Sequence, residues 1–227
     1  GVDVSQCANV LNRDNVVVFA HKLPITELSN AKIITSKEDS TSMLLYKSFA
    51  KKISFKDRQK LLVLLVNDIK KHTFDLPHSR ELDMLYRAYT GDKLSKFTTD
   101  FNIGYDGFSD KQKRLINFYK KSVENIIKDL NVFKGTIPFK GKTYNVVSTF
   151  AEKYINEISD KLLDDYNSDV CFVVNVDKER VSFRRSKNCD LDLSILADKI
   201  SHGGGFPYAA SGIMNENFIT ITKLFKQ

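Results

Sequence analysis

Two short segments near the start of the chain are apolar runs between polar flanks, which predicts strands there. Residues 15–19 (NVVVF) and 31–35 (AKIIT) are runs rich in β-branched side chains between turn-like segments, as expected of buried strands. Apolar residues then recur at helical spacing in three segments, at residues 40–50, 54–69 and 79–91. Ser54 and Ser79 are placed as the N-terminal caps of the second and third helices. This half of the chain is therefore predicted to be α/β.

The longest periodic stripe runs from Ile116 to Leu130 and predicts a connector helix within residues 115–135. Beyond it the pattern changes to short mixed elements: a tight turn at Gly141, a helix at 150–166, strands at 170–176 and 180–184, a helix at 193–200 and a closing strand at 218–224. The chain is thus predicted to hold two domains, an α/β domain in residues 1–114 and a smaller α+β domain in residues 136–227, joined by the connector helix.

Composition and charge narrow the class of protein. Of the 227 residues, 42% are hydrophobic, enough to bury a sizeable core, and the net charge is +7 (35 − 28), which favours a polyanionic partner without requiring one. Three cysteines without CxxC spacing favour a reducing compartment, and we expect the cytoplasm. No apolar run is long enough for a membrane span. The sequence is compatible with a homo-oligomer and with binding to a protein partner. The sequence begins at Gly1, so we expect further residues upstream of it.

Three residues in the first domain could carry chemistry. Asp68 falls on the apolar face of its helix, where a carboxylate needs a partner: an Arg, a helix N-terminus or a divalent cation. Asp3, in GVDVS, stands at the end of an apparent strand, where it is either a cap or a metal ligand. His21 directly follows the VVVF strand and is either structural, a metal ligand or a general acid.

A second group of candidates lies near the C-terminus. Arg180, Arg184 and Arg185 flank the strand VSFRRS, either as solvated charges or as a clamp for phosphate. The loop GGGFPYAASG follows after a short helix. Three glycines permit a close approach of the backbone to a ligand, although GGGF is neither a dinucleotide-binding nor a triphosphate-binding motif.

The string VSFRRS, DLDLSILADKIS and GGGFPYAASG resembles the C-terminal associated domain of the DHH phosphoesterase superfamily. The first half resembles the same superfamily at lower resolution. GVDVS is similar to its second motif, STSMLLY to the helix after its signature triplet, and VNDIKKHTFDLPHSREL to its fourth motif.

The resemblance implies a fold, a chemistry and a set of ligands. Residues 1–114 would be a truncated, Rossmann-like DHH domain, residues 115–135 the connector, and residues 136–227 the DHH-associated domain that binds substrate. The superfamily holds two divalent ions, usually Mn²⁺, and hydrolyses phosphoesters of nucleotides or short oligonucleotides. By position, the metal ligands would be Asp3, His21 and Asp68, with His21 also catalytic. The substrate contacts would be Arg184, Arg185, Ser186, Gly203, Gly204, Gly205 and Phe206.

The sequence departs from the superfamily pattern in three places. The Asp-His-His triplet reads FAHK, so that only His21 survives, the first motif is absent, and Phe206 stands where many members have His. The first hypothesis is therefore a degenerate member that binds a nucleotide or short oligonucleotide between its two domains and has lost or impaired metal-dependent hydrolysis. The alternatives are an active manganese-dependent phosphodiesterase with altered ligands, and a scaffold subunit for a protein partner.

Overall fold

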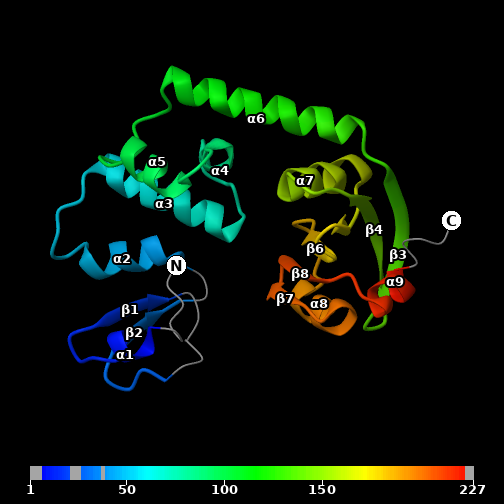
Figure 1. Cartoon of the computed structure of the whole chain (residues 1–227), viewed down its shortest axis with the longest axis horizontal. Coiled ribbons are helices and arrows are strands. Elements are labelled where there is room, and N and C mark those ends of the chain that lie inside the picture. Colours follow the sequence, from blue (N-terminus) through cyan, green and yellow to red (C-terminus); the bar gives the residue numbers. More distant parts are fainter. Residues whose placement is uncertain (1–6, 21–26, 37–38, 223–227) are drawn as a thin grey trace. The chain divides into compact units, whose positions relative to one another are not determined.

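The computed structural model describes residues 7–20, 27–36 and 39–222. The chain forms two compact units, Gly1–Lys120 and Lys121–Gln227, called unit 1 and unit 2 below (Figure 1). Helix α6 (Asp110–Lys128) runs across the division between them. Over the described residues, no helix combines the length and the apolar character that a bilayer span needs.

Unit 1 contains a pair of parallel strands and a set of helices. Strands β1 (Val17–Ala20) and β2 (Lys32–Thr35) pair in parallel, which confirms both predicted strands. The helices of this unit are α1 (Ala8–Leu11), α2 (Thr41–Phe49), α3 (Asp57–Lys71), α4 (Ser79–Ala88), α5 (Lys93–Asp100) and the first part of α6. The apolar faces of α3, α4 and α6 meet in a core formed by Leu65, Leu82, Leu85, Tyr89, Phe101, Tyr105 and Ile116.

Local sequence decides where these helices begin. Ser40 caps α2, because its hydroxyl accepts a hydrogen bond from the Met43 amide at 3.2 Å. Helix α3 begins later than Ser54 predicts: Lys56 is its N-cap residue, and the Gln59 side chain accepts a hydrogen bond from the Lys56 amide. Ser79 is the first residue of α4 rather than its cap.

Unit 2 contains a six-stranded sheet with the order β3-β4-β5-β6-β8-β7. The strands are β3 (Val132–Phe139), β4 (Lys142–Phe150), β5 (Val170–Asn175), β6 (Arg180–Arg185), β7 (Gly204–Phe206) and β8 (Ala209–Ile213). Only β4 and β5 pair in parallel. The predicted tight turn is confirmed, because Lys140 and Gly141 join β3 to β4 between the paired residues Phe139 and Lys142.

Three helices cover this sheet, α7 (Ile155–Tyr166), α8 (Leu193–Ser201) and α9 (Glu216–Thr222). Side chains alternate between the two faces of a strand. One face carries Val146, Phe172 and Phe183 and packs against α8 and α9. The other carries Val147 and Cys171 and packs against α7. The sheet therefore separates two apolar layers.

Two predicted elements of this unit are wrong in type or extent. The closing strand expected at 218–224 is helical over its described part. Phe218 in this helix is fully buried, and its ring centroid lies 5.8 Å from that of Phe172. The start of the helix is fixed by Asn215, whose side-chain oxygen accepts a hydrogen bond from the Phe218 amide at 2.8 Å. The helix expected from residue 150 begins only at Ile155, because Phe150 is still part of β4.

Candidate functional site

Asp68 is a buried carboxylate that organises the connection between α3 and α4. Its exposed fraction is 6%. The Thr73 hydroxyl and the Asp75 amide, the latter at 3.1 Å, donate to its Oδ1, and the Leu76 amide donates to its Oδ2 at 3.0 Å. The partner that the sequence requires for this carboxylate is therefore the turn that leads into α4.

These contacts also decide the charge of Asp68. Burial on its own raises the pKa of Asp68, but hydrogen bonds from Ser79, from Thr73 and from the two amides outweigh burial and keep the pKa below its usual value. Phe74 and His78 in the same connection have φ angles of 51° and 72°, a region that costs energy for residues other than Gly. The ionised carboxylate thus stabilises a turn that the backbone alone disfavours.

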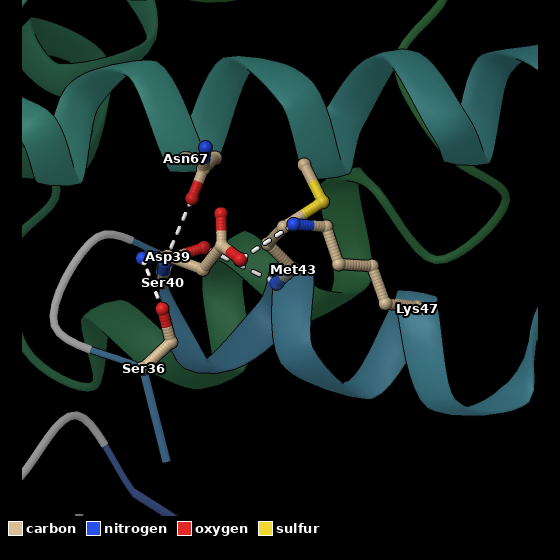
Figure 2. A network of polar contacts seen from close by, with 6 residues as sticks. All are labelled: Ser36, Asp39, Ser40, Met43, Lys47 and Asn67. Atoms are coloured by element: carbon tan, nitrogen blue, oxygen red, sulfur yellow. Dashed lines mark hydrogen bonds and ion pairs between the residues drawn. The ribbon is translucent and has the colours of Figure 1, made fainter.

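Asn67, the neighbour of Asp68 in α3, fixes the connection between β2 and α2 (Figure 2). Its Oδ1 accepts a hydrogen bond from the Ser40 amide at 2.7 Å. On the same connection, the Asp39 amide donates to Ser36 Oγ at 3.0 Å and Lys47 pairs with Asp39 at 2.6 Å. Sequence reasoning missed Asn67, because no local pattern links a helical Asn to a backbone amide 27 positions earlier.

The described residues do not assemble the metal ligands that the resemblance implies. Asp3 and His21 lie outside the described residues. Within residues 7–20, 27–36 and 39–222, no three His, Cys, Asp or Glu side chains are grouped as a metal site requires. The Asp68 carboxylate already accepts hydrogen bonds from the turn before α4. Of the three implied ligands the described residues thus include only Asp68, and we assign no chemical step to a metal.

In unit 2, the sheet face that α7 covers continues past this helix from β6 onto β8 and β7. Directly paired residues place their side chains on the same face of a sheet, so Arg184 on β6, Ala209 on β8 and Phe206 on β7 form one row. A second row consists of the small residues Ser182, Ser211 and Gly204. Helix α7 packs mainly on β4, β5 and β6, and Gly204 is exposed. We call these two rows the open face.

The two adjacent arginines point to opposite faces of the sheet. Arg184 lies on the open face, where its guanidinium donates to the Asn156 side chain of α7 and, at 2.8 Å, to the Phe183 carbonyl. Arg185 lies on the face that α8 covers, and its Nη1 donates to the Leu191 carbonyl at 3.1 Å. Both arginines are candidate substrate contacts from the sequence, but only Arg184 faces a ligand that would bind on the open face.

The glycine run leads into the edge strand β7 and is not a free loop. A Cβ at Gly203 would lie 2.1 Å from the Ser211 carbonyl oxygen, and a Cβ at Gly205 would lie 2.5 Å from the Ala209 carbonyl oxygen. Close contact between backbones therefore requires Gly at both positions. Gly204 differs, because a Cβ there would meet nothing within 4 Å. The packing of the described residues does not explain why this position lacks a side chain.

Ser186, another candidate contact from the sequence, lies in the turn after β6. Its amide donates to the Asp169 carbonyl at 2.9 Å, and its own carbonyl accepts a hydrogen bond from the Cys189 amide at 3.2 Å. Cys189 is buried, and burial raises the pKa of its thiol. The backbone of Ser186 thus shapes this turn.

An aromatic pair borders the open face at the turn between β7 and β8. The rings of Phe206 and Tyr208 are stacked, with centroids 5.5 Å apart and an interplanar angle of 4°. Burial raises the pKa of Tyr208, and the charge of nearby Arg184 opposes this rise without cancelling it. Phe206 is a candidate from the sequence, whereas sequence reasoning missed Tyr208, which the GGGFPYAASG string already contains.

An apolar pocket of about 420 Å³ lies at the other end of the same sheet. Phe150 and Val174, at the carboxyl ends of β4 and β5, line it together with Ile126 of α6. Because β6 runs antiparallel to β5, Arg184 lies beside the opposite end of β5. This pocket is therefore separate from the open face.

The fold resembles that of solved phosphoesterase structures. An exopolyphosphatase-related protein from Bacteroides fragilis is 16% identical, with a TM-score of 0.57; the match covers 96% of this chain, and this chain spans 65% of that protein. A pGpG-specific phosphodiesterase from Vibrio cholerae is 12% identical, with a TM-score of 0.52, over 90% of this chain and 79% of that one. No protein-family model and no curated protein matches the sequence. At these identities the likeness shows the fold alone, and that fold agrees with the resemblance to the DHH phosphoesterases.

Proposed function

We propose that this protein binds a nucleotide or a short oligonucleotide and that the open face of unit 2 holds its phosphate. The observation that carries the proposal is a half-buried arginine, Arg184, beside a row of small residues on a sheet face. A guanidinium held by Asn156 is pre-oriented for the paired hydrogen bonds that phosphate oxygens accept.

The neighbouring strand supports the same placement. β7 is the last strand of the sheet, and alternate backbone N–H groups of an edge strand point away from their single neighbour. Gly204 lets a ligand approach this backbone closely, because no side chain stands over it. In this proposal residues 136–227 form the substrate-binding domain, and residues 1–114 form the DHH-like domain.

We further propose that metal-dependent hydrolysis is lost or impaired. The sequence keeps one member of the Asp-His-His triplet, His21, and the Asp68 carboxylate is engaged by the turn before α4. A centre for two Mn²⁺ ions needs several oxygen and nitrogen ligands at once, and affinity falls steeply as ligands are removed.

The alternative is an active manganese-dependent phosphodiesterase that acts on oligonucleotides or cyclic dinucleotides. It is favoured by the likeness in fold to a phosphodiesterase specific for pGpG, a dinucleotide. In that case Asp3, His21 and Asp68 would hold the ions with altered geometry.

The test incubates the full chain with Mn²⁺ and pGpG, short RNA and DNA oligonucleotides, or cyclic dinucleotides, and follows binding and product together. Binding without product, weakened about tenfold or more by Arg184→Gln, supports the proposed binding module. Lys178→Gln is the charge-matched control, because Lys178 is exposed in the turn between β5 and β6 and lies outside the open face. Product formation that Asp68→Asn abolishes supports the active enzyme, and no binding of any ligand contradicts both.

A further inference from the structure

We infer that the ring pair Phe206 and Tyr208 stacks a nucleobase, so that the open face selects ligands that carry a base over inorganic phosphate chains. The inference rests on the proposed function and deepens it. Phosphate contacts alone do not distinguish a nucleotide from pyrophosphate or polyphosphate, because all of them present the same oxygens. A second group of contacts must make that distinction.

The ring pair is fixed in place before any ligand arrives. Phe206 and Ala209 are directly paired, so Pro207 and Tyr208 form a two-residue turn between β7 and β8. The Pro207 carbonyl accepts a hydrogen bond from the Leu193 amide at 2.9 Å, which ties the turn to the start of α8. The two rings are nearly parallel and each is partly exposed, so the stacked pair leaves its outer ring faces for a ligand at the edge of the sheet.

The pair lies at a suitable distance from the phosphate contact. Arg184 and Phe206 are separated by one strand, and two strand spacings amount to about 10 Å between their backbones. Ala209 between them is a small residue that is itself buried. The side chains of Arg184 and Phe206 both extend from the same face, which brings their tips within reach of one nucleotide.

Stacking predicts a particular selectivity. Every base has a π-face, so an aromatic surface binds all four bases. Removing one stacking aromatic weakens nucleic-acid binding by about 5- to 150-fold in such sites. A phosphate chain without a base gains nothing from the rings.

The same rings could instead serve only to pack the hairpin. Substitutions of Phe206 separate the two roles. Phe206→Leu keeps an apolar side chain for packing but removes the aromatic face, whereas Phe206→Trp keeps and enlarges it. The chain contains no Trp, so the tryptophan of Phe206→Trp is the sole one and its fluorescence reports directly on stacking.

The experiment titrates the full chain and both variants with guanosine 5′-monophosphate, pGpG and inorganic pyrophosphate, and measures each Kd by calorimetry. We expect Phe206→Leu to weaken the two nucleotides about 5- to 150-fold and to leave pyrophosphate within about twofold. In Phe206→Trp, both nucleotides should quench the fluorescence and pyrophosphate should not. Thermal unfolding of each variant checks that the hairpin stays folded.

The failures are distinguishable. If the unaltered chain binds pyrophosphate and nucleotides equally and Phe206→Leu changes neither, the inference is wrong and the proposed phosphate site stands. If Phe206→Leu weakens all three ligands alike, the rings support the hairpin and do not read the base. If the unaltered chain binds none of the ligands, the proposed function fails and the inference fails with it.

Discussion

The first two glycines of GGGF, Gly203 and Gly204, give opposite predictions although they are adjacent. At Gly203 an added Cβ would lie 2.1 Å from the Ser211 carbonyl oxygen, whereas ordinary contact begins near 3.4 Å, so the two atoms would have to separate by about 1.3 Å. At Gly204 an added Cβ would meet nothing within 4 Å. A side chain therefore disturbs the fold at the first position and only the open face at the second.

The magnitudes follow from these distances. Gly203→Ala forces β7 away from β8, and overpacking of this kind costs about 2–3 kcal/mol. For a unit of about 100 residues this lowers Tm by roughly 10–20 °C. Gly204→Val places a side chain in free space, and loss of the glycine restricts the unfolded chain, so its stability should stay within about 1 kcal/mol of the parent.

For ligand affinity we expect the larger effect at Gly204, the position where a substitution changes stability less. The valine of Gly204→Val stands on the open face in the row beside Arg184, where it blocks the approach of phosphate to β7. We expect its affinity for pGpG to fall about tenfold or more, which is about 1.4 kcal/mol. Circular dichroism on heating measures the stability, and calorimetry measures the affinity. A Gly204→Val variant that binds as tightly as the parent would refute the assignment of the open face, and an unchanged Tm for Gly203→Ala would refute the packing argument.

Three further predictions concern residues that each stabilise the fold of their own unit. Arg185→Ala should destabilise unit 2, because it removes a hydrogen bond on the α8 face, while pGpG affinity stays within about twofold of the parent in calorimetry. Asp68→Ala should lower the unfolding free energy of unit 1 by about 3 kcal/mol in urea titrations, and Asp68→Asn should lower it less, since an amide oxygen still accepts hydrogen bonds. Asp192 caps α8, and although burial opposes its charge, hydrogen bonds from Ser194 lower its pKa. Its contribution is therefore present above the usual pKa near 4 and is lost as pH falls through the lowered pKa of the folded state, so the parent and Asp192→Asn should converge in stability in strong acid.

The sequence alone was sufficient where local chemistry and tertiary packing agree. The β-branched runs of β1, β5 and β6 and the Lys140–Gly141 turn are encoded by neighbouring residues, and they were predicted within a residue or two. Prediction from the sequence failed where a contact between residues far apart in the chain decides the secondary structure. The segment FITIT alternates like a strand, but burial of Phe218 against Phe172 holds it as a helix. Helix α5 was missed altogether.

In the candidate site, too, some features follow from neighbouring residues and others depend on distant contacts. That Asp68 needs a partner follows from its place on an apolar helix face, but its donors come from a turn whose left-handed residues, Phe74 and His78, carry no glycine signal. Local sequence could not show that turn, because the carboxylate itself stabilises it.

The arginine pair could have been separated from the sequence alone. In VSFRR the apolar residues Val181 and Phe183 alternate, and both are fully buried on the face that α8 covers. By the same period of two, Arg185 belongs to that face and Arg184 to the other. A strand that buries two apolar residues on one face therefore already assigns the second arginine to structure and the first to an exposed surface. The contrast between Arg184→Gln and Arg185→Ala tests that assignment, since a one-residue slip in register would exchange their effects on affinity and stability.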